Sequence, residues 1–509
     1  MAWLRFSIIL LLNMCVLIAH SSPIEADAPL TMQVARSAAD ATYAVTVNLT
    51  SSQHSCDVRF LSVAIGSRRI TLDWNGSEKL LNLASALSPA DLRLGGTSAN
   101  FLHFDPTERP GTRDRFYTSS HKTPFTVTAR QWDLFVSFLR KAGLDLLFNV
   151  NNLMWTKDGS WDPSNADKLL NYSSAKGVQI PYFQLGNEPS SYQRNFYINR
   201  SPQKLVQDYR TLKNLLAKYP LYAGSKLNGP DVANVATSYK ARVYLQEFVA
   251  AGANDIVDEL SIHHYYMDSR KARMEDFISP TWMNYLKHDL AHAQTISRSS
   301  PRPKPVTLTE TASCSNGGAS GLSDRYIAGF LWLDKLGLAA QSGVTRVFRQ
   351  TFLGGYYALI SNRHDPHPDF YLSVLYKQLI EGPVFNLNIS PPNPQLRVYA
   401  HCARTLLYLP GAIVVYYLNL EKSQTVLSLS QFQANDLHLY QLTPGDTSGL
   451  TSKYVKLNGQ TLMMSGTKLP TLLPRLQTGD VTLEALSFGF IVVPHANVSL
   501  CVEYFQRDP

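Results

Sequence analysis

From about residue 60 to residue 383, short apolar runs alternate with longer stretches of helical spacing. The short runs predict β-strands at residues 144–148, 182–185, 221–225, 259–263, 305–309 and 344–348. Apolar residues at helical spacing predict helices at 165–176, 202–218, 238–250, 280–296, 323–340 and 369–380. Such alternation is typical of an α/β fold with a parallel sheet and crossover helices, and its length favours an eight-stranded β/α (TIM) barrel. A doubly wound open sheet is the alternative, but no glycine-rich phosphate loop follows any of these strands.

The pattern changes at about residue 384. After Pro391-Pro-Asn-Pro394, short β-rich runs at 396–400, 412–417, 437–441 and 488–493 are separated by turn residues. This pattern predicts a β-sandwich over residues 384–509. The run at 42–47 has the same character, so residues 22–59 are expected to add one or more strands to the sandwich, leaving 60–383 as the barrel.

The first 21 residues have the features of a secretory signal peptide. One positive charge, Arg5, precedes apolar runs at 8–12 and 16–19, and small residues follow at Ser21 and Ser22. A retained membrane anchor is the alternative. No later segment reaches the apolar length that spans a bilayer, so we expect a secreted or lysosomal protein with no transmembrane segment in the mature chain. Six Asn-X-Ser/Thr triplets agree with this route: Asn48, Asn75, Asn171, Asn199, Asn388 and Asn497.

Four cysteines remain after the predicted signal peptide, too few to build a fold of this length from disulfides. Cys402 and Cys501 flank the β-rich tail, and we predict that they pair. Closing a loop of about 100 residues stabilises a protein by roughly 4–5 kcal/mol in the chain-entropy model. The state of Cys56 and Cys314 stays open.

Charge favours an acidic partner. The chain has 47 basic and 39 acidic residues, a net charge of +8 and a pI near 9.0. It contains no nucleic-acid-binding motif and no long Lys/Arg block. For a secreted protein, this balance points to a sulfated or carboxylated polysaccharide rather than to nucleic acid.

Two glutamates follow predicted strands directly. Glu188 lies in Leu185-Gly-Asn-Glu-Pro189, and Glu310 lies in Thr309-Glu-Thr311. A single glutamate after a strand is usually a solvated loop residue. Two at strand ends of one barrel would face the same cleft, and a retaining glycosidase needs such a pair: one residue protonates the leaving oxygen and the other attacks the anomeric carbon.

Several stretches together give the chain a specific resemblance. It is similar to the heparanases, retaining endo-β-glucuronidases that cut heparan sulfate. The resemblance implies that Glu188 is the acid/base and Glu310 the nucleophile, with carboxyls about 5–5.5 Å apart and no cofactor. The negative charge of Glu310 should help Glu188 to keep its proton. The matching stretches are 60–63, 93–97, 143–147, 185–189, 229–232, 263–266, 333–338 and 396–399.

The same resemblance implies further substrate-binding residues. Asn187 would bond the sugar 2-position, Tyr265 would steer the nucleophile, and His263 would lie in the same pocket. Because adjacent strand residues face opposite sides, we expect one of His263 and His264 to line the pocket and the other to pack, and we expect no metal site. The remaining residues are a further sugar contact, Thr97; a cradle for the glucuronate carboxylate, Gly317, Gly355 and Tyr357; and sulfate ligands, Arg194 and Arg270.

Three departures from the heparanase pattern affect the expected specificity. Residues 233–237 have no charge where the family has a basic run, and Gly66 stands where the family has a substrate-contacting Asp. The segment from Asp105-Pro106 to Val127 is short, so we expect activity as one polypeptide without excision of a linker. Other basic residues that could serve outer sugars are Arg113, Arg115, Lys122, Arg130 and Arg140.

Three functions therefore remain open. The first is an endo-β-glucuronidase that cleaves internal glucuronic acid–glucosamine linkages of heparan sulfate or a related glycosaminoglycan. The second is an exo-β-glucuronidase of the same fold, and the third is a non-catalytic heparan sulfate binder. The presence of both glutamates argues against the third.

Overall fold

Eight parallel strands close into a barrel in the computed structural model, which describes residues 41–107 and 122–507. The closed order is β10-β11-β2-β3-β6-β7-β8-β9, so the predicted β/α barrel is confirmed. The strands are β2 (Leu61–Gly66), β3 (Ala90–Gly95), β6 (Leu144–Val150), β7 (Tyr182–Leu185), β8 (Lys226–Val232), β9 (Glu259–Asp268), β10 (Val306–Ser315) and β11 (Val347–Gln350).

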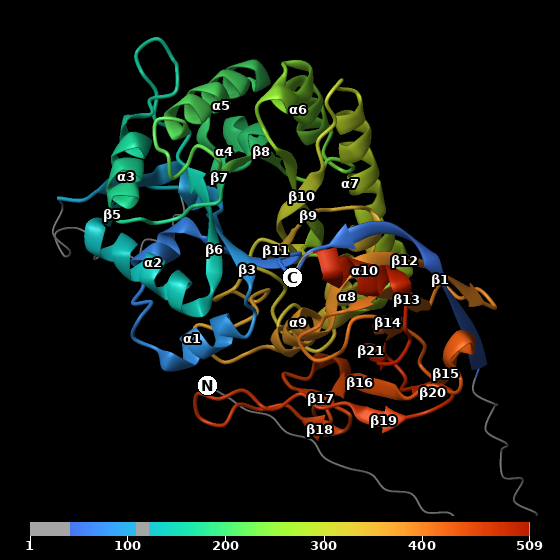
Figure 1. Ribbon diagram of the computed structural model, residues 1–509. Helices are drawn as coiled ribbons and strands as arrows, with labels where there is room; N and C mark the ends of the chain where they lie inside the picture. The colour runs from blue at the N-terminus through green and yellow to red at the C-terminus, as the bar shows by residue number, and fades with distance from the viewer. Residues whose placement is uncertain (1–40, 108–121, 508–509) are drawn as a thin grey trace, which may run out of the picture. The chain divides into compact units, whose positions relative to one another are not determined.

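Helices surround these strands (Figure 1). Helix α2 (Ala129–Ala142) shows how the sequence sets the ends of a helix. Thr128 and Gln131 form a capping box at its start, and Gly143 ends it in the left-handed conformation at φ +69°. The helices are α1 (Glu78–Ser85), α2 (Ala129–Ala142), α3 (Ser164–Ala175), α4 (Tyr192–Phe196), α5 (Pro202–Leu216), α6 (Tyr239–Ala250), α7 (Pro280–Arg298), α8 (Ala328–Gln341) and α9 (Pro368–Leu379).

One predicted barrel strand was misplaced. Residues 221–225 form turns, and the strand is β8, which begins at Lys226. Tyr222 is apolar enough to resemble a strand residue, but its ring is buried after α5 and its hydroxyl donates to the carbonyl of Val178. The true strand contains Asn, Gly, Pro and Asp, which in sequence resemble a turn.

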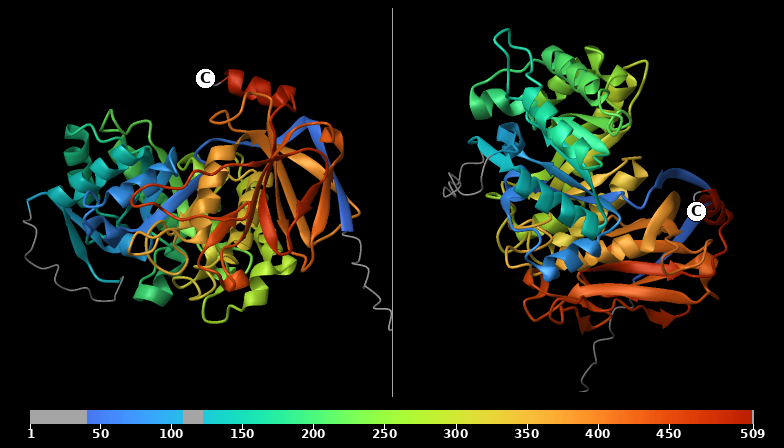
Figure 2. Two further views of the ribbon diagram at one scale, coloured as in Figure 1. Left: turned by 90° about the horizontal axis from the view of Figure 1, so that it is seen from below. Right: turned by 60° about the vertical axis from the view of Figure 1, so that its left-hand side comes forward.

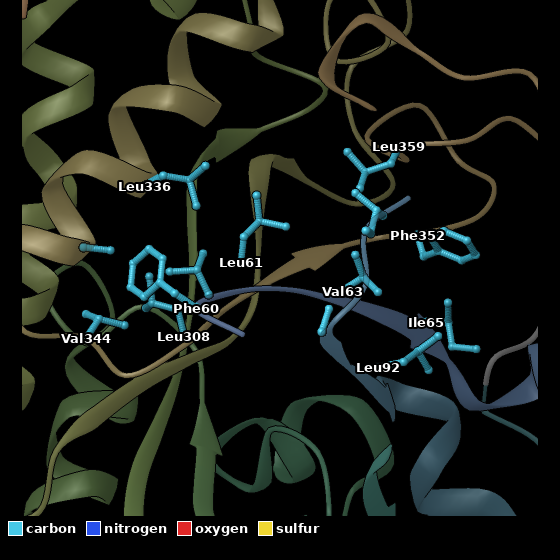
Figure 3. Packing of buried hydrophobic residues seen from close by; sticks show 14 of the residues in the cluster. Phe60, Leu61, Val63, Ile65, Leu92, Leu308, Leu336, Val344, Phe352 and Leu359 are labelled. Carbon is cyan, nitrogen blue, oxygen red and sulfur yellow. The ribbon is translucent and has the colours of Figure 1, made fainter. Parts of the chain in front are cut away.

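The barrel core consists of branched aliphatic and aromatic side chains, as expected for parallel strands covered by helices. Figure 3 shows this packing around β2, where Leu61, Val63 and Ile65 lie near Leu92 of β3 and Leu308 of β10. All five side chains are fully or almost fully buried. This rigid frame positions the polar residues at the strand ends.

The C-terminal strands form a sheet with its own apolar core. Eleven strands join in one hydrogen-bonded network that includes the N-terminal strand β1 (Ala41–Cys56), which pairs with β12 and β15 as predicted for residues 42–47. Val45 of β1 and Leu427 of β15 share this core with Val415 and Ile491, so the sheet folds over itself as a sandwich. Its other elements are β12 (Ile380–Ser390), β13 (Leu396–Ala403), β14 (Ile413–Asn419), β15 (Thr425–Leu429), β16 (Leu437–Pro444), β17 (Val455–Leu457), β18 (Gln460–Thr461), β19 (Arg475–Gln477), β20 (Val481–Leu483), β21 (Ser487–Val493) and the helix α10 (Ser499–Arg507).

The ends of the sandwich bear on three predictions. Strand β12 begins at Ile380, directly after α9, so the boundary expected between residues 383 and 384 falls inside a strand. A disulfide joins Cys402 of β13 to Cys501 of α10, as predicted, whereas Cys56 and Cys314 are buried free thiols. The predicted signal peptide and the rest of residues 1–40 lie outside the described residues.

Helix α8 lies between the barrel and the sandwich. All of its residues from Ala328 to Ala340 are buried. Asp334 pairs with Arg397 of β13, and the Tyr399 hydroxyl donates to the same carboxylate at 2.5 Å. A Cβ on Gly337 would lie 2.5 Å from the Tyr399 ring, so glycine is required for this close approach. Figure 2 shows the helices and the strands of the C-terminal sheet from two further directions.

Within the described parts of the chain, no helix combines the length and the apolar character needed to cross a bilayer.

Candidate active site

Glu188 follows β7 in a strained backbone conformation. Its φ is +52°, a left-handed value that is uncommon for a residue with a side chain. Its N–H donates to the carbonyl of Asp231 at 3.1 Å, and Asp231 is itself left-handed at φ +65°. The preceding Asn187 is fixed on both sides by Asn100, which accepts from its N–H at 3.0 Å and donates to its carbonyl at 3.0 Å. Backbone strain held by such contacts is often found at functional sites.

His263 of β9 connects Glu188 to a buried carboxylate. Its Nδ1 lies 3.0 Å from Oε1 of Glu188, and its Nε2 lies 3.0 Å from Oδ1 of Asp231. The His263 and Asp231 side chains are inaccessible to solvent, whereas the Glu188 side chain is 22% exposed. Glu188 therefore reaches the cleft while its supporting residues stay buried.

Glu310 of β10 is held from two directions. The Tyr265 hydroxyl donates to Oε1 at 2.7 Å, and the Arg93 guanidinium donates to Oε2 at 3.0 Å. The Glu310 side chain is 12% exposed. Glu310 is also the Cα partner of His263 in the β9–β10 pairing, so the residue that contacts Glu188 lies directly beside Glu310.

Arg93 of β3 joins these groups into one network. Besides Glu310, its guanidinium donates to Gln184 at 2.8 Å, to the Asn187 side chain at 2.8 Å and to Asp231 at 2.5 Å. Planar guanidinium groups suit such multiple, directed bonds. Five strands, β3, β7, β8, β9 and β10, thus contribute to a single hydrogen-bonded cluster.

Two irregular strand positions make this cluster possible. The β8–β9 register shifts between Pro230 and Val232, and the β9–β10 register shifts between Leu308 and Glu310. Each shift inserts one extra residue, Asp231 or Thr309, and such bulges redirect neighbouring side chains. The Thr309 hydroxyl donates to Oδ1 of Asp231 at 2.5 Å, so the two irregularities contact each other.

Electrostatic interactions fix the charges of the two buried side chains, Asp231 and His263. Burial opposes ionisation of Asp231, but the positive charges of Arg93 and His263 outweigh it and lower the Asp231 pKa. Burial also disfavours the His263 imidazolium, but Asp231 and Glu310 outweigh it and raise the His263 pKa to about 10. His263 is therefore protonated at neutral pH, with Nδ1 donating to Glu188 and Nε2 forming an ion pair with Asp231.

The neighbouring His264 points away from the cluster. Its Nδ1 lies 3.0 Å from the Lys335 Nζ, and its Nε2 lies 3.6 Å from Asp289. Burial, followed by the nearby Lys335 charge, lowers the His264 pKa well below its usual value. The two histidines thus point in opposite directions, as adjacent residues of a strand do, with His263 facing Glu188 and His264 packed on Lys335. Within residues 41–107 and 122–507, no group of three or more His, Cys, Asp or Glu side chains is arranged to hold a metal ion.

A cavity of about 740 Å³ adjoins the cluster. Gly317, Gly355 and Tyr357 all line it, and the Tyr357 ring stacks on Tyr265 with centroids 6.3 Å apart. A Cβ on Gly355 would lie 3.6 Å from the Gly317 carbonyl oxygen, so these two loops lie against each other. The three residues expected to hold a carboxylate are thus brought together at this cavity, which neither glutamate lines, and Tyr357 connects it to Tyr265, the residue that donates to Glu310. Gly66 also lines the cavity.

Other predicted residues lie outside the cluster. Arg194 is exposed on α4 and donates to Ser191 at 3.4 Å, and Arg270 is exposed and bound to Asp268 by two hydrogen bonds. Thr97 follows β3 and is half-buried, next to the cavity residue Ser98. Lys122, Arg130 and Arg140 are exposed, whereas Arg113 and Arg115 fall outside the described residues. All six predicted glycosylation asparagines are exposed.

Sequence reasoning missed the residues that organise the cluster. Arg93 and Asp231 were noted only as parts of matching stretches, and Gln184 and Thr309 only as strand residues. The available signal was a charge inside an apolar strand, as in Leu92-Arg93-Leu94. Such charges are seldom buried without a partner.

A closed β/α barrel with one glutamate after β7 and another within β10, in one polar network beside a cavity, defines a barrel glycoside hydrolase. Solved structures agree on the fold. A 4-O-α-L-rhamnosyl-β-D-glucuronidase from Fusarium oxysporum matches with a TM-score of 0.67 at 14% identity, covering 88% of this chain and 99% of that one. An α-L-arabinofuranosidase from Thermotoga maritima matches with a TM-score of 0.66 at 12% identity, covering 89% and 99%.

Sequence comparisons identify the family. Residues 40–337 match the model for the N-terminal domain of glycosyl hydrolase family 79. The chain is 35% identical to heparanase of Rattus norvegicus, covering 87% of this chain and 91% of that protein. It is 33% identical to a hyaluronoglucuronidase of Hirudo nipponia, covering 84% and 91%, and 31% identical to human inactive heparanase-2, covering 84% of each. The chain belongs to glycosyl hydrolase family 79 and is a glycoside hydrolase.

Proposed function

We propose that this enzyme is a retaining endo-β-glucuronidase that cleaves internal glucuronic acid–glucosamine linkages of heparan sulfate. The observation that carries the proposal is the single network holding Glu188 through His263 and Glu310 through Tyr265 and Arg93. This network includes one carboxylate that follows β7 and one within β10, with β8 and β9 between the two strands, and gives each a different set of partners. Different environments suit different roles in acid and nucleophilic catalysis.

In the first step, a Glu310 carboxylate oxygen attacks the anomeric carbon of glucuronate. The glycosidic C–O bond breaks, and Glu188 transfers its proton to the departing glucosamine oxygen. Oε1 of Glu188 faces His263, so we assign the leaving-group contact to Oε2. The Tyr265 and Arg93 donors keep the attacking carboxylate aimed.

In the second step, water hydrolyses the glycosyl-enzyme. Glu188, now without its proton, takes a proton from the water as its oxygen bonds to the anomeric carbon, and the bond to Glu310 breaks. The product retains the β-configuration. Asn187 would hold the sugar 2-hydroxyl, since Arg93 fixes its side-chain oxygen at 2.8 Å.

The shape of the site supports endo action. The cavity is lined by Tyr357 and also by residues that follow β2. In glucuronate, the carboxylate on C5 neighbours O4, through which the preceding sugar is attached. A carboxylate held by Gly317, Gly355 and Tyr357 therefore places that sugar toward the cavity, and 740 Å³ is within the usual range of ligand sites.

Hyaluronan is a second candidate substrate. Residues 233–237, directly after β8, contain no charged side chain, and a relative 33% identical is a hyaluronoglucuronidase. An unsulfated polymer needs fewer basic contacts than heparan sulfate does.

The non-catalytic alternative has a relative in its favour, inactive heparanase-2, but here both glutamates are present in the network.

The deciding experiment incubates the purified protein with heparan sulfate and with hyaluronan at mildly acidic pH and sizes the products. Shortened chains support endo action, and free glucuronic acid supports exo action. Glu310→Gln should abolish turnover while keeping the affinity for substrate, and NMR of the first-formed product should show the β-anomer. No cleavage of either polymer would refute the proposed function.

Entry into the secretory pathway belongs to the same proposal. The exposure of all six glycosylation triplets is compatible with it. Expression in animal cells should give protein in the medium or in lysosomes, with a mass that falls after treatment with an N-glycosidase. Protein found only in the cytosol with no change in mass would contradict this.

A further inference from the structure

Arg349 is a buried charge outside the catalytic network. It lies in β11, near the C-terminal end of that strand, and its side chain is 1% exposed. In the pairing of β10 with β11 it is the Cα partner of Thr311, the residue that follows Glu310. None of its described hydrogen bonds or ion pairs reaches either glutamate. Because a buried charge is costly without partners, the partners of Arg349 indicate what it does.

The guanidinium of Arg349 binds the backbone of Tyr357. Its Nε donates to the Tyr357 carbonyl at 3.0 Å, and its Nη2 donates to the same oxygen at 2.8 Å. The Tyr357 N–H donates to the Gly317 carbonyl at 3.2 Å. Tyr357 is therefore fixed at both of its backbone polar groups, between the end of β11 and the loop that follows β10.

The loop that carries Tyr357 needs such fixing because it is rich in glycine. Gly354 has a φ of +75° and Gly355 a φ of +94°, and Gly317 on the facing loop has a φ of +89°. Glycine adopts these left-handed values without strain, but it also has more conformational freedom than other residues. The contact with Arg349 therefore gives the loop a fixed point that glycine residues do not provide.

Arg349 is itself held by two helices outside the barrel. Its Nη2 lies 2.8 Å from Oδ2 of Asp369, a buried carboxylate in the first turn of α9. Its guanidinium lies 4.8 Å from the ring centre of Trp332 in α8, within the range of a cation–π contact. The Trp332 indole donates to the Ser373 hydroxyl at 2.9 Å, and that hydroxyl donates to the Asp369 carbonyl at 2.7 Å. The protein itself therefore sets the position of the guanidinium before any ligand binds.

We propose that Arg349, anchored by Asp369, is a positioning residue that sets the preference of the enzyme for a uronate over a neutral sugar. The inference rests on the proposed function, which assigns the glucuronate carboxylate to Gly317, Gly355 and Tyr357. By fixing the Tyr357 backbone, Arg349 keeps this loop in the geometry that binds a carboxylate. Hydrogen bonds to a charged group are strong, and they depend on such geometry.

The support of this loop is separate from the support of the catalytic groups. Asn187 and Glu310 are held by Arg93, which shares no described hydrogen-bond partner with Arg349. Loss of the Arg349 contact should therefore weaken recognition of the carboxylate and leave the contacts with the rest of the sugar in place.

The test measures by calorimetry how tightly Glu310→Gln binds two hexasaccharides. One alternates glucuronate and N-acetylglucosamine, and the other is its carboxyl-reduced form, with glucose in place of glucuronate. Glu310→Gln should bind the uronate form about tenfold more tightly or better. Adding Arg349→Met/Asp369→Asn removes the ion pair without leaving a buried charge unpaired. It should reduce this preference about fivefold or more and change the affinity for the reduced form less than about twofold.

Arg346→Met/Asp91→Asn, in the same Glu310→Gln background, is the matched control. It removes a second buried arginine–aspartate pair, which lies at the start of β11, and it should change the preference less than about twofold. Thermal melts must first show that all variants fold. Asp369→Asn alone keeps the Arg349 charge but releases the guanidinium, so it should also lower the preference. A rise would show that Arg349 acts through its charge rather than by positioning, and would overturn the inference.

Two further results would also overturn the inference. An equal loss for both hexasaccharides would show that the ion pair only supports the fold, and an unchanged preference would show that the loop needs no anchor. Equal binding of the two hexasaccharides by Glu310→Gln itself, or no cleavage of heparan sulfate or hyaluronan by the wild type, would refute the proposed function and the inference with it.

Discussion

Single residues at the base of the site control its charge. His263 keeps its proton because the negative charges of Asp231 and Glu310 outweigh the effect of burial and raise the His263 pKa to about 10. Asp231 in turn stays ionised because Arg93 and His263 lower its pKa. A cationic histidine therefore faces Glu188.

This coupling predicts a specific pH dependence of stability. A pKa raised from 6.5 to about 10 contributes stability that is fully present below pH 6.5 and is lost as the pH rises through about 10. The unfolding free energy of the wild type minus that of His263→Gln should therefore be largest near pH 6 and shrink by roughly 3–5 kcal/mol by pH 10. Urea denaturation at several pH values measures this. A difference that stays constant or grows with pH would contradict the assignment.

Asp231 should act as a positioning residue. Asp231→Asn removes the charge that holds Arg93 and His263, so we expect kcat to fall at least 100-fold with a smaller change in KM. Because Asp231 raises the His263 pKa, the His263 imidazole should titrate at lower pH in this variant, which NMR of the ring protons measures. Asp255→Asn, at an exposed position, is the matched control. A lower kcat with an unmoved His263 titration would indicate a purely structural role.

At the scale of elements, the alternation of strands and helices was readable from residue 144 onward, where each strand but one begins with a short apolar run, whereas no strand was predicted at β2 or β3. The exception, β8, contains Asn228, Gly229, Pro230 and Asp231, whose turn-forming character hid the strand. The same residues support the site. The bulges at Asp231 and Thr309 were not predictable, because the extra residue in a strand shows only in the pairing with its neighbours. The two glutamates were predictable because each directly follows an apolar run.

Helix α8 provides a test of the contact between barrel and sandwich. In Gly337→Ala, the added methyl group would lie 2.5 Å from the buried Tyr399 ring. Overpacking of this kind costs about 1–3 kcal/mol, which exceeds the gain in helix propensity. Thermal or denaturant unfolding measures the loss. Lys287→Ala on the exposed side of α7 should change stability by less than about 0.5 kcal/mol. Equal effects of the two changes would mean that the ring moves aside freely.

At the scale of the whole molecule, the short connection between β4 (Leu102–Asp105) and β5 (Phe125–Thr128) matters for activation. Residues 106–124 leave little chain to cover the cleft, so we predict an active single polypeptide. Purified protein should run as one band on a reducing gel and cleave its substrate without added protease. Intact protein that becomes active only after nicking would refute this prediction.

The burial of α8 has a further consequence for how the protein can be divided. The family match ends at residue 337, inside this helix. A chain cut there, or at the end of the barrel, would leave an apolar helix and the charge of Asp334 without the partners that β13 supplies. The segment that the family model matches, residues 40–337, is therefore not an independent folding unit, and a protein that keeps the catalytic barrel must also keep the sheet beside it.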